Sequence, residues 1–205
     1  MTRRATLLLR AFVFVIFVLA ISGQPAEKPL WLDAKPKQWN RAGGSIPKVK
    51  QPFGDADIKD LKNRCDASRQ IPSPDSPEVQ TVAGRGWKVF KSQSDFHGIV
   101  IVSAQQDYDG MCRPIGYQDF VFVNGVYAGT LSPKSMDART DGASINASFP
   151  GDGKSDGKIS AEFVRYAVKD PLCCPSRVSE ATYEIQMVGG KPVVVLTNVR
   201  THPTN

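Results

Sequence analysis

The alternation of apolar and polar residues in the second half of the chain is typical of antiparallel β-strands. The stretch FVFVNGVYAGT, residues 120–130, has apolar strand formers on both sides of Asn124-Gly125, a dipeptide preferred in two-residue hairpin turns. Residues 158–166 alternate between polar and apolar side chains along most of their length, which predicts a strand with one buried face. That face holds Ile159, Ala161, Phe163 and Arg165.

Other segments extend this pattern to a whole domain. Strands are predicted at residues 86–90, 98–104 and 144–149, and a second hairpin at 181–199 turns at Gly189-Gly190. Two short helices are predicted, at residues 57–63 and at 77–84, where Ser76 precedes a first-turn proline. We therefore predict an α+β, mainly β fold, with a single antiparallel meander sheet and one or two short helices on a face or edge.

Residues 24–76 have a different composition, with recurrent prolines and few apolar residues. Such a segment buries too little surface to offset its ordering entropy, so we interpret it as an arm or linker. Trp31, Trp39, Ile46 and Phe53 are spaced like anchors of an extended arm. The arm either binds a partner or packs on its own domain, and we favour the second. The predicted domain is then 77–200, with a tail at 201–205.

The first 23 residues have the pattern of a secretory signal peptide. Three arginines precede an apolar run from Ala11 to Ile21, which is followed by small residues, so cleavage is expected after Ser22 or Gly23. The run is shorter than the roughly 20 apolar residues that a bilayer requires. We expect an exported protein, periplasmic or secreted, with no stable membrane span after cleavage. The alternative is an uncleaved N-terminal anchor.

Loss of this segment also changes the charge. Removing its three arginines lowers the formal net charge from +6 to +3. The basic residues that remain at 35–41 and 48–50 form no phosphate-tracking stripe, so we expect no nucleic-acid partner.

The four cysteines are Cys65, Cys112, Cys173 and Cys174. An even number in an exported chain favours two disulfides, for which three pairings exist. We rank a bond between the neighbours Cys173 and Cys174 last, because a ring that small is strained. Each of the other pairings would join Cys65 and Cys112 to the adjacent pair and staple the fold. Neither the cysteine spacing nor the two histidines fit a zinc site, and we expect no metal or cofactor.

No catalytic motif is present in the sequence. His97 is the one histidine of the predicted domain, and no nucleophile elbow accompanies it. One enzymatic alternative remains, a hydrolase that uses carboxylates near turns together with Arg113 or Arg139. The candidate carboxylates are Asp107, Asp109, Asp137 and Asp141.

Two motifs in this order resemble the LppP/LprE lipoprotein family of bacterial envelopes. They are VF-x-NG-x-YAGT, ending at Thr130, and VRY followed by D-x-LCCPS, ending at Ser176. The similarity spans about residues 86–199. It implies an exported cell-envelope protein with no established enzymatic activity. No cysteine stands at the expected cleavage site, so this chain lacks the residue through which a lipoprotein is anchored.

We therefore expect a non-catalytic binding or structural module of the envelope, and an enzyme is less expected. Its partner would be an envelope polymer, a small ligand or another protein. The candidate ligand-facing residues are Arg113, Tyr117, Tyr127, Arg139 and Tyr166.

Overall fold

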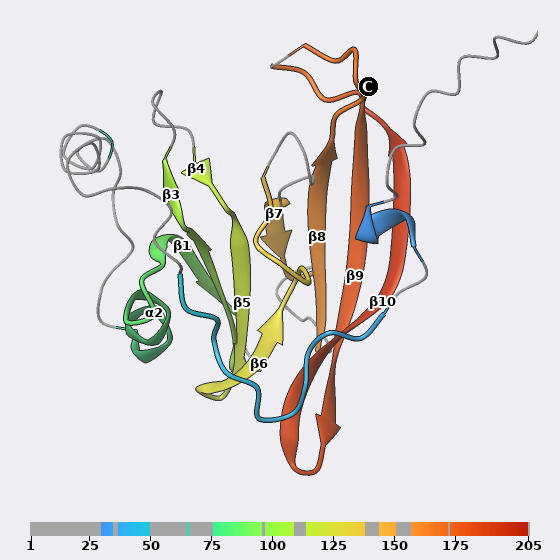
Figure 1. Ribbon diagram of the computed structural model, residues 1–205. Coiled ribbons are helices and arrows are strands. Elements are labelled where there is room, and N and C mark those ends of the chain that lie inside the picture. Colours follow the sequence, from blue (N-terminus) through green and yellow to red (C-terminus); the bar gives the residue numbers. More distant parts are fainter. Residues whose placement is uncertain are drawn as a thin grey trace, which may run out of the picture.

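The computed structural model describes most of the predicted domain and part of the arm (Figure 1). The described residues are 30–34, 37–49, 65, 76–95, 97–108, 114–137, 144–150, 157–171 and 173–204. The predicted signal peptide and the predicted helix at 57–63 lie outside them. Among the residues described, no helix is long and apolar enough to cross a membrane.

The first of two sheets is antiparallel, with strand order β1-β2-β5-β6. Its strands are β1 (Lys88–Ser94), β2 (Ile99–Gln105), β5 (Gln118–Val123) and β6 (Val126–Thr130). The β5–β6 turn has positive φ at Asn124 (49°) and Gly125 (77°), as the Asn-Gly hairpin prediction requires. A two-stranded ribbon of β3 (Asp107–Tyr108) and β4 (Pro114–Ile115) lies between β2 and β5 in the chain.

The second sheet is also antiparallel, with strand order β10-β9-β8-β7. Its strands are β7 (Ser144–Ser148), β8 (Lys158–Arg165), β9 (Arg177–Val188) and β10 (Lys191–Pro203). The predicted turn at Gly189-Gly190 joins β9 to β10, which continues into the residues assigned above to a tail.

The predicted single meander sheet is wrong, because the strands form two separate four-stranded sheets. The physical reason lies in the first sheet, which buries side chains on both of its faces. Val121 packs into the core between the sheets, whereas Phe120 and Phe122 pack into a second core on the opposite side. A continuous apolar run such as FVFV is typical of a strand covered on both faces, which one open sheet does not provide.

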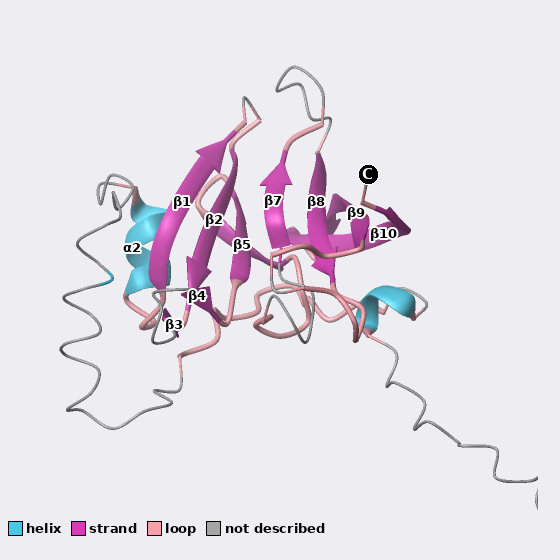
Figure 2. Cartoon of the chain, turned by 90° about the horizontal axis from the view of Figure 1, so that it is seen from above, coloured by secondary structure: helices cyan, strands magenta, loops and turns pink. Residues whose placement is uncertain are grey.

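The layers are visible in Figure 2, where α2 (Pro77–Ala83) lies outside the first sheet and the second sheet lies on the other side. Helix α2 contributes Val79 and Val82 to the outer core. The inner core includes the predicted buried face of β8, and Arg165 at the end of that face is 4% exposed.

The described part of the arm packs on its own domain, which is the alternative that we favoured. Its short helix η1 (Trp31–Asp33) brings Trp31 against the inner core, next to Trp39, and Ile46 is buried in the outer core. Phe53, the fourth expected anchor, lies outside the described residues. Figure 1 shows the arm crossing one side of both sheets.

The expected long-range staples from the adjacent cysteine pair are not formed. Cys173 and Cys174 are disulfide-bonded to each other and exposed, whereas Cys65 is fully buried and disulfide-bonded elsewhere. The neighbours meet because the loop turns tightly, with the Cys174 N–H donating to the Pro171 carbonyl (3.1 Å). The Asp170 carboxylate fixes this loop by accepting from the N–H groups of Ala167 (2.6 Å) and Ser176 (2.9 Å). These hydrogen bonds, that from Ala167 first, lower the pKa of Asp170.

Candidate ligand-binding site

A pocket of about 330 Å³ lies where the arm crosses the first sheet. One wall comes from the arm, and the other comes from β5 and β6, the loop that follows β6, and the residues Trp87 and Gln106. The described residues that line it are Trp39, Asn40, Arg41, Gly44, Ser45, Pro47, Lys48, Trp87, Gln106, Gln118, Tyr127, Gly129, Thr130, Pro133, Lys134 and Ser135.

The buried side chain of Asn40 attaches the arm to both sheets. Its Nδ2 donates to the carbonyls of Thr130 on β6 (2.9 Å) and Val194 on β10 (3.0 Å). Its Oδ1 accepts from the Thr130 N–H (2.9 Å). Each of these strands is the last strand of its sheet on that side. One amide therefore satisfies polar groups on two sheet edges, much as a residue of a neighbouring strand would.

Gly129 makes this close approach possible. Its φ is +139°, a conformation that residues with a Cβ rarely adopt. A Cβ at this position would also lie 2.7 Å from Asn40 Nδ2. The glycine of the YAGT motif thus leaves the room in which the Asn40 amide packs.

Two tryptophans hold the arm on either side of the pocket. The indole N–H of Trp39 donates to the Thr130 carbonyl (3.1 Å), and that of Trp87 donates to the Pro47 carbonyl (2.7 Å). Between these points the arm makes a turn, closed by a bond from the Gly44 N–H to the Arg41 carbonyl (3.0 Å). The arm wall is therefore fixed at both ends of the pocket.

The opposite wall is held by glutamine side chains. Gln118 accepts from the Ser132 hydroxyl (2.7 Å) and donates to the Ser132 carbonyl (3.3 Å). Gln106 donates to the Ser135 hydroxyl (3.0 Å). These bonds fix the loop after β6 against the sheet, so both walls are formed without a ligand.

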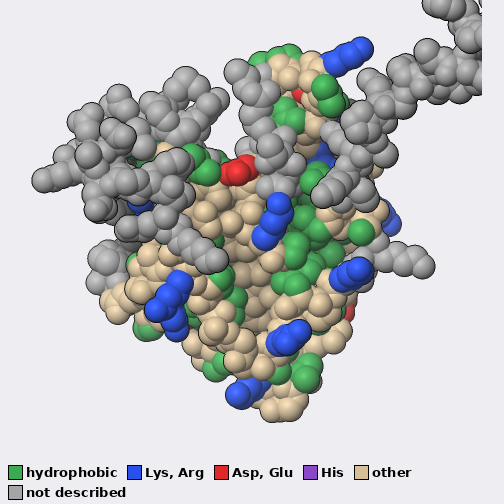
Figure 3. Space-filling model, in the orientation of Figure 1, with side chains coloured by type: hydrophobic (Ala, Val, Ile, Leu, Met, Phe, Trp, Pro, Cys, Tyr) green, Lys and Arg blue, Asp and Glu red, His purple; other side chains and the backbone are tan. Residues whose placement is uncertain are grey.

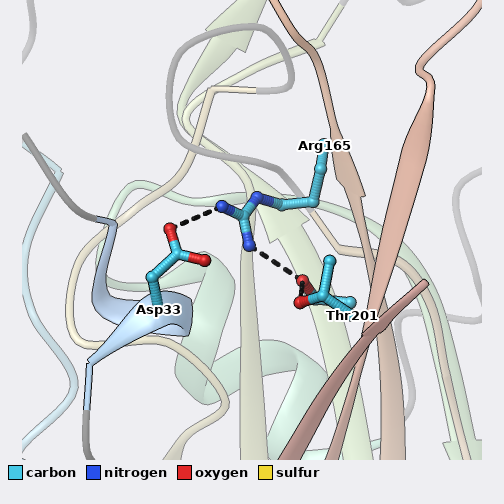
Figure 4. Close-up of polar contacts among 4 residues, drawn as sticks. Asp33, Arg165 and Thr201 are labelled. Atoms are coloured by element: carbon cyan, nitrogen blue, oxygen red, sulfur yellow. Dashed lines mark hydrogen bonds and ion pairs between the residues drawn. The ribbon is translucent and has the colours of Figure 1, made fainter. Parts of the chain in front are cut away.

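An ion pair anchors the start of the described arm (Figure 4). The buried Arg165 guanidinium donates to Asp33 of η1 (2.6 Å) and to the Ser179 hydroxyl (2.9 Å). Ser179 also shares a hydrogen bond with Thr201 (2.7 Å), so β8, β9 and β10 all contribute to this site. Arg165 thus lies at the end of the apolar face of β8, and its charge is paired with Asp33 of the arm.

The charged residues among the described pocket lining are all basic: Arg41, Lys48 and Lys134. In Figure 3, Lys and Arg side chains are spread over the face that the arm crosses, and acidic side chains show at few places. Burial raises the pKa of the Tyr127 hydroxyl in the pocket wall to about 12. Tyr127 therefore stays protonated near neutral pH and can donate a hydrogen bond.

Of the five candidate ligand-facing residues, the structure places one at the pocket and two elsewhere, and two lie outside the described residues. Tyr127 lines the pocket, whereas Tyr117 and Tyr166 are not among its described lining residues. Tyr117 packs edge-on against Phe90, with ring centroids 6.0 Å apart. Arg113 and Arg139 lie outside the described residues. Contact between a ligand and any of the five stays a prediction.

The turn carboxylates of the hydrolase alternative have structural partners where the structure describes them. Asp107 pairs with Lys88 (2.7 Å), and Asp137 accepts from the Gly116 N–H (3.0 Å). Asp109 and Asp141 lie outside the described residues, so their convergence with an arginine stays untested. The part of the chain that the structure describes holds no group of three or more metal-ligating side chains.

Sequence reasoning missed the pocket residues of the arm, above all Arg41 and Lys48. Their segment was predicted to be an arm or linker, and composition alone does not show where on the domain an extended segment lies. Trp31 and Trp39 were recognised as anchors of the arm, but no pattern in the sequence indicated that Arg41 and Lys48 line a pocket.

Two packed antiparallel sheets with an outer helix and a pocket beneath an extended arm define a small β protein with a preformed pocket. Residues 92–187, from within β1 to within β9, match the family model of the LppP/LprE lipoproteins, and this part of the chain belongs to that family. The resemblance seen in the motifs is thereby confirmed. No curated protein and no solved structure matches the chain. The matched range contains one pocket wall and omits the arm that forms the other.

Proposed function

We propose that this protein is a non-catalytic binding module of the cell envelope and that the pocket beneath the arm is its ligand site. The observation that carries the proposal is the pocket itself. Its volume of about 330 Å³ is within the range of small-ligand sites. Its lining combines aromatic rings with amides, hydroxyls and cations, the groups that orient a ligand by packing and hydrogen bonds.

The protonation state of Tyr127 supports binding rather than proton transfer. A general acid or base works best with a pKa near the operating pH. Burial holds the pKa of Tyr127 at about 12, far above that range. In the proposed role, its hydroxyl donates a hydrogen bond to the ligand.

The test is a screen of envelope-derived small ligands, including sugars and short wall peptides, by amide chemical shifts of the full exported chain. Ligand-induced shifts should cluster at the pocket, around Gln118, Tyr127 and Thr130. Ser45→Trp, which fills the pocket from the exposed arm, should abolish them. Val168→Trp, at a residue that is 90% exposed and outside the lining, should not.

Shifts that survive Ser45→Trp, or that map to the loop at Cys173 and Cys174, would contradict the proposed site. A screen in which no ligand shifts the pocket amides would contradict the proposed function.

We also propose that the chain is exported, with residues 1–22 or 1–23 removed, and acts in the periplasm or outside the cell. The support is the basic and apolar N-terminal pattern together with the lipoprotein family match. Intact mass of the protein recovered from the exported fraction tests this. A mass that retains residues 1–23 would contradict it.

A further inference from the structure

The arm presents two cations at the pocket in positions that the fold determines. Arg41 directly follows Asn40, whose amide is bound to both sheets. Lys48 directly follows Pro47, whose carbonyl accepts the indole N–H of Trp87 (2.7 Å). Both cations therefore have fixed backbone positions, although their side chains are exposed.

Neither cation is used within the described structure. The ion pairs among the described residues join Lys88 to Asp107, Arg165 to Asp33 and His202 to Glu180. No carboxylate belongs to the described residues that line the pocket. Two fixed cations without a described acidic partner, at the mouth of a preformed pocket, indicate an anionic ligand.

The remaining lining indicates what carries the anionic group. Trp39 is half-buried, and its N–H is bound to Thr130, so the part left at the pocket is an apolar ring surface. Tyr127 adds a second aromatic ring with a hydroxyl donor, and Ser45 and Ser135 add further hydroxyls. Apolar ring faces beside hydroxyl groups match a sugar ring, which has an apolar C–H face and a polar rim.

We propose that the pocket binds an anionic sugar unit, a pyranose that carries a carboxylate. The ring packs against Trp39 and Tyr127, and the anionic group lies between Arg41 and Lys48. This inference rests on the proposed function, because it names the ligand class of the same pocket. Together with Lys134, Arg41 and Lys48 make only three cations at the pocket, which is too short a row for a nucleic-acid backbone, so a single anionic unit is the better match.

The experiment titrates the full exported chain with two matched pairs of probes and follows amide chemical shifts. The pairs are N-acetylmuramic acid with N-acetylglucosamine, and glucuronic acid with glucose. In each pair the acidic sugar should bind at least about tenfold more tightly and shift the amides of Tyr127 and Thr130. The difference should shrink between 20 mM and 500 mM salt, since exposed charges are screened.

Arg41→Gln combined with Lys48→Gln should remove the preference for the acidic sugar. Lys169→Gln, which removes an exposed charge outside the pocket, should retain it. The salt series on the unaltered chain gives an independent answer if the double variant folds poorly.

Each remaining outcome overturns this inference in a recognisable way. Equal binding of acidic and neutral sugars at the pocket would refute the anionic class and leave the binding module standing. Binding of the acidic sugars away from the pocket would refute the assignment of the site. No binding of any of the four sugars, with other ligands still found by the pocket screen, would refute a sugar ligand alone. No binding by any ligand would refute the proposed function as well.

Discussion

Replacing Asn40 by alanine should separate the arm from the two sheet edges. Asn40 is 9% exposed and makes three hydrogen bonds of 2.9–3.0 Å to Thr130 and Val194. The costs of losing them differ. The Thr130 N–H would be left buried without its acceptor, which costs about 2 kcal/mol. The two carbonyls keep second donors, from Trp39 (3.1 Å) and Gln38 (3.0 Å), so each loss costs about 0.5 kcal/mol.

The expected decrease in the free energy of unfolding is therefore about 3 kcal/mol, a large part of the roughly 5–15 kcal/mol typical of a domain. The assay is urea unfolding followed by tryptophan fluorescence, in which the midpoint should fall by about 1 M or more. Hydrogen exchange of the Thr130 amide reports the same contact locally and should become fast. Gln38→Ala is the matched control, since it removes one bond from an exposed side chain and should cost about 0.5 kcal/mol.

A variant with the urea midpoint of the parent and a still-protected Thr130 amide would refute this reasoning. It would mean that the arm is held by its apolar anchors alone. If only the Thr130 amide changed, the contact would be local and the calculated global loss would be wrong.

Three further predictions follow from the described geometry. Gly129→Ala should lower the free energy of unfolding in urea by about 3 kcal/mol, because it combines a strained φ of +139° with a clash against Asn40. Gly157→Ala is the control, with φ +73° and no atom within 4 Å, and should cost about 1 kcal/mol. Equal losses in the two variants would exclude the clash. The pKa of Tyr127 is 10 in the unfolded chain and about 12 in the folded protein, so the free energy of unfolding should fall as the pH rises between these values. Tyr127→Phe should make this fall shallower in alkaline unfolding. An unchanged slope would contradict the raised pKa. Replacing Cys173 and Cys174 together by serine should lower the free energy of unfolding by under about 1 kcal/mol, because a bond between neighbours closes no long loop. A loss above about 3 kcal/mol would contradict this and would indicate that these cysteines crosslink distant parts of the chain.

The sequence predicted the local elements well, because local chemistry determines them. Asn124-Gly125 and Gly189-Gly190 form the turns that their positive φ values allow, and residues 158–166 bury the expected face. The number of sheets could not be predicted in this way. It depends on which face of β5 another layer covers, and the run FVFV fits burial on both faces without naming the partners.

The candidate site was less predictable still. Tyr127 was a candidate, but its neighbours in the pocket come from a segment about 80 residues earlier in the chain. The contact depends on the amide of Asn40, a residue type common in loops, meeting a glycine whose role is to leave room. Neither residue has a pattern that indicates the other. The bond between Cys173 and Cys174 was ranked last because of the strain expected in so small a ring, and the structure shows that this ranking was wrong.

The contacts of Asn40 also cover backbone groups at the edges of the two sheets. β6 and β10 are edge strands, and an uncovered edge is a template for pairing with a strand of another molecule. The arm occupies the Thr130 and Val194 groups that such a strand would use. Proteolytic loss of the arm would therefore do more than weaken the fold. It would expose two protected strand edges to pairing with other molecules, so a chain without the arm should aggregate more readily.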